Sequence, residues 1–249
     1  KDLPIVQQPI PDFNFPDPTI TQVEVEITYR CNIECSTCNR LVHRFVPPDS
    51  DMTVAQIEKF IGELNARKTP MHRVSVMGGE AIMHPSFVKI FWMLSRANIR
   101  ELWVVTNGKK PLPPGIKGIK YRKTGQTIEQ KHHANIYASP LESGMKMRRC
   151  RIPKQCGIGL NAWGYWPCGP GGCLARLLRM PHLQRLSLPD SLATWDYNGL
   201  CEHCMHSADR PPTKAVADEG AFELIRSTPI YHQAIRDWKE QGPPELARY

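Results

Sequence analysis

The residues of this chain that most directly suggest chemistry are its nine cysteines. Three of them follow the spacing CxxxCxxC, namely Cys31, Cys35 and Cys38. A zinc ion takes four ligands, usually as two close pairs, whereas three close cysteines suit a cubane iron–sulfur cluster whose fourth iron stays open. The spacing by itself leaves both sites open: an iron–sulfur cluster, or zinc with His43 as a fourth ligand.

A second group of six cysteines lies in the last 100 residues: Cys150, Cys156, Cys168, Cys173, Cys201 and Cys204. Cys201 and Cys204 form a CxxC pair, which is typical of metal ligands. The chain starts without the charged-then-apolar pattern of a secretory signal, and clustered cysteines in such a chain are more often metal ligands than disulfides. We therefore expect a soluble, cytoplasmic protein with metal sites.

The composition excludes several classes of protein. The chain has 249 residues, of which 41% are hydrophobic and 22% charged, so it is neither collagen-like nor mostly disordered and can bury a real core. No apolar run reaches the roughly 20 residues that cross a bilayer, so no membrane partner is expected. The net charge of +8 is compatible with an anionic ligand, but scattered lysines are its commoner cause, so nucleic acid is not an expected partner.

Three strand patterns position the first motifs. Apolar and polar residues alternate over 23–27, directly before the cysteine triplet, and further strands are predicted at 73–76 and 102–105. The motifs after these two strands are Gly78-Gly79-Glu80 and Thr106-Asn107-Gly108. Each of the three strands therefore ends in a motif of polar or glycine residues.

Two amphipathic helices separate these strands. Thr53 and Gln56 predict a capping box at the start of the first helix, and apolar residues at helical spacing fill 87–94 in the second. Alternating strands and helices predict parallel pairing with right-handed crossovers, in which ligands bind at the carboxyl ends of the strands. All three motifs lie at such ends, so we expect them to form one site.

The rest of the chain predicts further units. The five prolines in residues 1–20 predict an extended segment, and a strand is expected near 135–138. Residues 157–166 resemble a hairpin, and the tail from about residue 215 is expected to be helical, with a break at Pro229. We therefore expect four units: the extended N-terminal segment (1–20), the unit of alternating strands and helices (21–145), the second cysteine-rich unit (146–207) and the helical tail (208–249).

In their order and spacing, the three motifs resemble those of the radical S-adenosylmethionine (radical SAM) superfamily, over roughly residues 20–140. This resemblance implies an α/β fold built on a partial (β/α) barrel. It implies a 4Fe–4S cluster on the cysteine triplet, with S-adenosylmethionine at the open iron. Thr37 stands where the family often has an aromatic residue before the third cysteine.

The same resemblance implies roles for the other two motifs. Gly78 and Gly79 would let the backbone approach the methionine group closely, and Glu80 would accept a hydrogen bond from its amino group. Thr106 and Asn107 would complete the cofactor site. One electron from the cluster would cleave S-adenosylmethionine to a 5′-deoxyadenosyl radical, which abstracts a hydrogen atom from the substrate.

The second cysteine group resembles the twitch domain of radical SAM enzymes, a small irregular α+β unit with an auxiliary 4Fe–4S cluster. The ligands that this resemblance implies are Cys150, Cys168, Cys201 and Cys204. Zinc remains an alternative here. Cys156 and Cys173 are then spare: both could be packed thiols, or one could replace Cys150 as a ligand. The sharper hypothesis is that Cys156 donates a hydrogen atom to a substrate radical.

The resemblance predicts an enzyme of natural-product biosynthesis that acts on a small polar substrate: a sugar, a cyclitol, or a nucleoside or nucleotide. The expected reaction is an oxidation, an epimerisation or a rearrangement, and the expected electron donor is a flavodoxin or ferredoxin. Lys109 and Lys110 follow the third motif and are candidates to attract a substrate phosphate, although a solvated basic loop is equally compatible. The alternatives are a peptide-modifying radical SAM maturase and, in another class, a zinc-organised nucleic-acid-binding protein.

Overall fold

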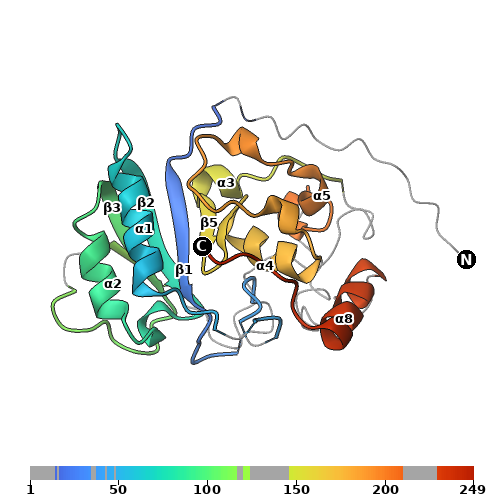
Figure 1. The fold of residues 1–249 in the computed structure, drawn as a ribbon, viewed down its shortest axis with the longest axis horizontal. Helices are drawn as coiled ribbons and strands as arrows, with labels where there is room; N and C mark the ends of the chain where they lie inside the picture. Colours follow the sequence, from blue (N-terminus) through green and yellow to red (C-terminus); the bar gives the residue numbers. More distant parts are fainter. Residues whose placement is uncertain are drawn as a thin grey trace, which may run out of the picture.

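A six-stranded, mostly parallel sheet forms the centre of the molecule, for which we have a computed structural model (Figure 1). The structure describes residues 15, 17–34, 38–42, 44–47, 49–116, 120–123 (backbone only), 146–209 and 229–249. Its strands are β1 (Gln22–Thr28), β2 (Met71–Gly78), β3 (Ile99–Thr106), β4 (Lys120–Lys123), β5 (Ile158–Asn161) and β6 (Gly164–Trp166). Their order is β4-β3-β2-β1-β5-β6, and β5 with β6 is the antiparallel pair. Over these residues the sheet is an open partial barrel, as predicted.

Two helices cover one face of this sheet, α1 (Val54–Asn65) and α2 (Phe87–Leu94), as Figure 1 shows. The predicted capping box starts α1: the Thr53 side chain accepts a hydrogen bond from the Gln56 backbone, and the Gln56 side chain accepts one from the Thr53 backbone. Phe60 is fully buried in the core, and burying such a side chain contributes about 1.5–3 kcal/mol. Strand alternation places Val23 and Val25 in the same core, so the other face of β1 carries Glu24 and Glu26.

The opposite face is covered by α4 (Gly169–Leu177), which contacts β1, β5 and β6. Short elements surround α4 on this side (Figure 1). They are α3 (Ile152–Gln155), α5 (Asn198–Cys201), α8 (Pro229–Gln241) and the 3-10 turns η2 (Pro181–Leu183), η3 (Leu192–Thr194) and η4 (Met205–Ser207). A further 3-10 turn, η1 (Ala81–Met83), follows β2 and contacts α2. No helix among the described residues has the length and apolar character to cross a membrane.

The predicted hairpin at 157–166 extends the barrel sheet, whereas the sequence placed it in a separate second unit. β5 pairs in parallel with β1, with Val23 opposite Ile158 and Val25 opposite Leu160. Gly157 makes this pairing possible, because a Cβ there would lie 2.2 Å from the Gln22 carbonyl oxygen. The sheet therefore continues across the expected boundary between residues 145 and 146.

Other expectations fall in part outside the described residues: most of the extended segment 1–20, the strand near 135–138 and the first part of the tail. The helix expected after the break at Pro229 is present as α8, which begins at Pro229 itself.

Candidate cluster and cofactor site

The three predicted motifs lie together at the carboxyl ends of β1, β2 and β3. The Asn107 backbone N–H donates to Glu80 Oε2 at 2.7 Å, which joins the motif after β3 to the motif after β2. The Asn107 side-chain amide donates to Asn32 Oδ1 at 2.8 Å, and its nitrogen is 3.9 Å from Cys31 Sγ. Asn107 therefore connects all three loops at one edge of the sheet.

Glu80 is the buried acidic group of this edge, with 1% of its surface exposed. Its Oε2 atom accepts the hydrogen bond from Asn107, but its Oε1 atom is buried and has no hydrogen-bond partner within the described structure. A buried acceptor without a partner costs free energy, about 1–3 kcal/mol or more when it is charged. The site therefore fits a ligand that brings a hydrogen-bond donor to Glu80, as the amino group of S-adenosylmethionine would.

Gly78 and Gly79 have a structural role that the sequence did not predict. A Cβ atom on Gly78 would lie 2.0 Å from the Thr28 carbonyl oxygen, and one on Gly79 would lie 2.4 Å from the Arg30 carbonyl oxygen. The two glycines thus let this loop lie directly on the chain that leaves β1. Backbone hydrogen bonds from Gly79 to Thr28 (2.9 Å) and from Glu80 to Arg30 (2.7 Å) fix it there. This close approach is to protein backbone, and the predicted approach to the methionine group stays a prediction.

The cysteine triplet follows β1 directly, and two of its members are described. Burial raises the pKa of the Cys31 thiol, and the nearby Cys38 raises it further. Both thiols lie in the segment that follows β1, and binding of a metal cluster would displace their protons. Cys35, Thr37 and His43 lie outside the described residues.

A buried ion-pair cluster lies directly behind the triplet, and the sequence analysis missed it. Arg40 pairs through Nη2 with Glu24 Oε2 and through Nε with Glu26 Oε1, both at 2.7 Å. The side chain of Arg40 is 5% exposed and that of Glu26 is 1% exposed. The available signal was an arginine two residues after the last cysteine, together with two glutamates on one face of the preceding strand.

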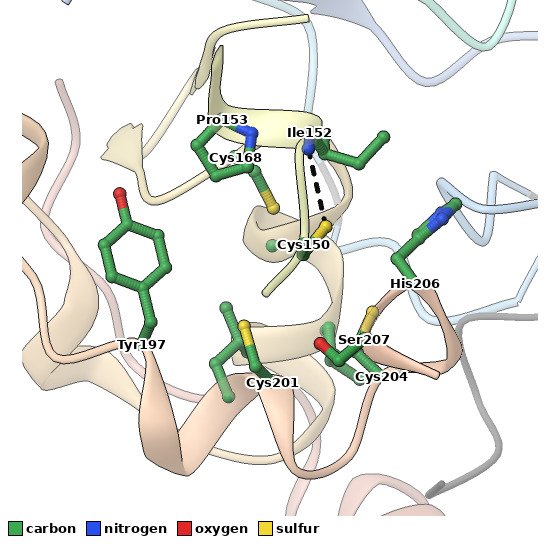
Figure 2. Close-up of a pocket in the computed structure, with 12 residues that line it drawn as sticks. Cys150, Ile152, Pro153, Cys168, Tyr197, Cys201, Cys204, His206 and Ser207 are labelled. Atoms are coloured by element: carbon green, nitrogen blue, oxygen red, sulfur yellow. Dashed lines mark hydrogen bonds between the residues drawn. The ribbon is translucent and has the colours of Figure 1, made fainter. Parts of the chain in front are cut away.

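Four cysteines from the second group surround a cavity between α3, α4 and α5 (Figure 2). They are Cys150, Cys168, Cys201 and Cys204. Figure 2 shows their sulfur atoms directed toward one another across this space of about 400 Å³, part of which is open solvent. Apolar side chains, among them Leu174 and Leu200, line much of the rest. The structure therefore brings together the four cysteines that the sequence assigned to one site.

The environment of this cavity disfavours free thiolates. Burial, together with the neighbouring thiols, raises the pKa of Cys168 and Cys204 well above the usual range and that of Cys201 to about 12. No three histidine, cysteine or acidic side chains among the described residues are placed to hold a single metal ion. In a 4Fe–4S cluster each cysteine binds a different iron, so the sulfurs stand further apart than the ligands of one ion. Cys150, Cys168, Cys201 and Cys204 are the residues that would hold such a cluster.

The two spare cysteines lie in different places. Cys156 ends α3 and precedes Gly157, which packs on Gln22 at the amino end of β1. The cysteine triplet follows the carboxyl end of this seven-residue strand, which spans roughly 20 Å. This position argues against the prediction that Cys156 donates a hydrogen atom at the active site.

Cys173 is buried on α4, and its thiol donates to the carbonyl oxygens of Asn39 and Pro170, each at 3.1 Å. Burial raises its pKa to about 12, so it is a protonated thiol close to the first site.

Thr106 is buried, and its hydroxyl accepts a hydrogen bond from the Gly108 backbone at 3.1 Å.

Lys109 and Lys110 have exposed side chains at the end of β3, and the Lys109 backbone donates to Asn107 Oδ1 at 2.9 Å. They lie at the predicted edge of the sheet. The structure shows no group of partners around them that would mark a phosphate site within the described residues.

Comparison with known proteins relates the first site to a family. A model of the radical SAM superfamily matches residues 25–119. A GTP 3′,8-cyclase from Synechocystis sp. is 26% identical over 89 residues, and one from Paracoccus denitrificans is 30% identical over 98 residues. Each match covers 36% of this chain and 27% of the relative, so the chain spans little more than a quarter of these proteins.

Among solved structures, the chain is similar to BtrN in complex with AdoMet and 2-DOIA. The similarity has a TM-score of 0.34 and 21% identity, and it covers 38% of this chain and 39% of BtrN. The segment matched by the family model contains the cysteine triplet, Glu80 and Asn107, and the structure places Cys31, Glu80 and Asn107 at one edge of the sheet. Residues 25–119 are thus identified as a radical SAM superfamily domain.

Proposed function

We propose that this chain acts as a radical SAM enzyme, with S-adenosylmethionine bound between the cysteine triplet and Glu80. The observation that carries this proposal is the buried Glu80 Oε1 atom, which has no hydrogen-bond partner within the described structure and lies beside the motif that contains Cys31. The residues that would hold the 4Fe–4S cluster are Cys31, Cys35 and Cys38. When bound, this cluster supplies the electron that cleaves S-adenosylmethionine to the 5′-deoxyadenosyl radical.

The protein's own groups orient the cosubstrate. Glu80 accepts a hydrogen bond from its amino group, and the Asn107 backbone holds Glu80 in place from the other side. Asn107 is itself fixed through Asn32, so the amide does not have to reorganise when the ligand binds. The low exposure of Glu80 and Asn107, 1% and 8%, keeps water away from the carboxylate.

We further propose that the second cavity holds an auxiliary 4Fe–4S cluster on Cys150, Cys168, Cys201 and Cys204. Support comes from the four inward-directed sulfurs and the space between them. Four protein thiolates would occupy all four irons, which leaves none for a substrate. This site is therefore suited to accepting an electron during an oxidation, and less suited to holding the substrate directly.

The substrate that we favour is a small polar molecule: a sugar, a cyclitol, or a nucleoside or nucleotide. The relatives are named for a reaction of GTP, which favours the nucleotide branch, although the matched 36% of the chain covers the cofactor region. Exposed Lys109 and Lys110 would attract a phosphate at the same edge of the sheet. A peptide substrate is the alternative. The radical SAM domain removes the support for a zinc-organised nucleic-acid-binding protein.

The decisive experiment is to count iron, sulfide and zinc per chain after anaerobic reconstitution, and to measure 5′-deoxyadenosine formed from S-adenosylmethionine. The parent should hold about eight irons, and a Cys31/Cys35/Cys38→Ala variant about four, with no 5′-deoxyadenosine. A parent with about four irons and a variant with none would contradict the auxiliary cluster. Zinc without sulfide would contradict the proposed function as a whole.

A further inference from the structure

The guanidinium of Arg40 lies between the two cysteine sites. Arg40 follows Cys38 by two residues, and its Nη2 atom is 2.7 Å from Glu24 Oε2. This ion pair rests directly on Gly169, the residue after Cys168. A Cβ on Gly169 would lie 1.9 Å from Glu24 Oε2 and 2.6 Å from Arg40 Nη2. One ion pair therefore touches the segments that carry a ligand of each site.

The ion pair is part of a buried group of four charges in which the signs balance. Glu24 and Glu26 from β1 carry the negative charges, and Arg40 and Arg176 the positive ones. Arg176 extends from α4 and donates to the Tyr29 hydroxyl at 3.1 Å, and Tyr29 in turn donates to Glu26. Because these side chains are buried, solvent and salt screen their charges poorly.

The helix α4 is tied to the first site at a second point. The Cys173 thiol donates to the carbonyl oxygen of Asn39, which lies between Cys38 and Arg40. Cys168 is the N-cap residue of α4, so the helix runs from a ligand of the second site to the segment behind the first. The ion pair is thus connected to the first site through the chain between Cys38 and Arg40. The hydrogen bond from Cys173 connects the helix of the second site to the same segment.

We propose that the Glu24–Arg40 ion pair is an electrostatic element shared by the two cluster sites, in which Arg40 favours the reduced state of both clusters and Glu24 opposes it. This inference rests on the proposed function, because it requires clusters at the two cysteine sites. Reduction adds one negative charge to a cluster, so a buried cation nearby stabilises the reduced state and raises the reduction potential. A buried anion at the same distance has the opposite effect.

Because Glu24 and Arg40 carry opposite charges, removing each charge should shift the reduction potentials in opposite directions. Arg40→Gln removes the positive charge and should lower the reduction potentials of both clusters. Glu24→Gln removes the negative charge and should raise both potentials, and the double variant E24Q/R40Q should return them toward the parent values. Structural damage alone would not shift the potentials in opposite directions, so the sign distinguishes electrostatics from disturbed packing.

The experiment is a redox titration of the reconstituted holoenzyme followed by electron paramagnetic resonance, after iron and sulfide have been counted. The control is Arg96→Gln, which removes the same charge from an exposed position after α2 and should leave the potentials unchanged. Where R40Q does not take up a cluster, E24Q and the double variant carry the sign test. Unchanged potentials in E24Q and R40Q, or shifts in the same direction, would overturn the proposal.

The iron count separates this result from a failure of the proposed function. A parent with one cluster contradicts the auxiliary site, while opposite shifts of that cluster's potential in R40Q and E24Q would still show the electrostatic effect at one site. Opposite shifts at one cluster and none at the other, in a protein with both, would overturn the claim that the pair is shared.

Discussion

The two cysteine sites of this protein are positioned by different kinds of structure. The first lies where β1, β2 and β3 end, and the hydrogen bonds of a parallel sheet hold its loops in place. The second lies among α3, α5 and the start of α4, where two of the three elements have four residues each. The first site is therefore positioned by the strand ends of one sheet, whereas the second is positioned by short helices and the start of a buried helix.

The sites also differ in how complete they are. Around the first, Glu80 Oε1 has no hydrogen-bond partner among the described groups, which leaves a place for a ligand. In the second, four thiols face one another in a largely apolar cavity. The first arrangement suits a cofactor that binds a cosubstrate, and the second suits a cofactor enclosed by protein.

The strongest test of this comparison removes the CxxC pair. Cys201→Ser with Cys204→Ser should lower the iron content by about four per chain and speed hydrogen exchange in residues 198–207, which carry α5 and η4, because metal-binding free energy stabilises such small units. The β1–β3 core should remain folded. Iron analysis and hydrogen exchange along the chain would measure both effects. The control is Cys156→Ser, which should keep the full iron content. Equal loss of protection in both halves would show that the sites do not differ as described.

A second test concerns the loop after β2, in which Gly79 packs on the backbone that leaves β1. Gly79→Ala would place a methyl group 2.4 Å from the Arg30 carbonyl oxygen and should destabilise the protein by about 1–3 kcal/mol. Gly62→Ala is the matched control, because a Cβ there meets nothing within 4 Å in α1 and should stabilise by about 0.5–1 kcal/mol. Urea unfolding would measure both. A harmless G79A variant would mean that this loop is not fixed on the backbone after β1.

The Glu80→Gln variant tests whether the first site, unlike the enclosed second site, is open to a ligand. The amide oxygen can still accept the hydrogen bond from Asn107, so the fold should persist, but the negative charge facing the ligand is lost. A hydrogen bond to a charged group contributes about 1.5–3 kcal/mol, so the affinity for S-adenosylmethionine should fall about 10- to 100-fold. Calorimetry on reconstituted protein measures this. Exposed Glu58→Gln on α1 is the control, and equal affinities of parent and E80Q would contradict the proposed role.

The smallest expected effect concerns His84, which holds the loop after Glu80. The Ser86 backbone N–H donates to its Nδ1 at 3.0 Å, so its Nε2 carries the proton and donates to the Met52 carbonyl oxygen at 2.9 Å. Burial lowers the pKa of this imidazole below the usual value. The unfolded chain therefore takes up the proton first as pH falls, and the stability that depends on neutral His84 is lost below about pH 6.5.

A His84→Gln variant should show a smaller loss of unfolding free energy between pH 7.5 and pH 5.5 than the parent. Urea titrations at the two pH values compare the slopes. Identical pH dependence in the two proteins would show that protonation of His84 does not weaken this loop.

The barrel and the first site could be predicted because their signals are local. Alternation at Val23 and Val25, and the capping box of Thr53 and Gln56, report on neighbouring residues alone, and both are present in the structure. Parallel strands then place their ends at one edge, so the motifs had to meet there. The CxxC spacing of Cys201 and Cys204 predicts a metal site, and the structure places both cysteines at one cavity.

The remaining features depend on residues far apart in the chain. Gln22 and Gly157 meet because β5 joins the free edge of β1, and that pairing moved Cys156 to the opposite end of the sheet from the first site. The reason for a glycine at position 79 is its close contact with the Arg30 backbone, and this contact forms only in the folded chain.

The sequence by itself determined the alternating strands and helices, the motifs at their ends and the resemblance of residues 25–119 to radical SAM domains, because each of these is encoded in short-range spacing. The tertiary structure decided which edge the hairpin extends, which atom of Glu80 stays without a partner, and that Arg40 lies between two sites more than 100 residues apart in the chain. The physical reason is that burial and charge pairing depend on contacts between distant segments, and these contacts exist only once the chain has folded.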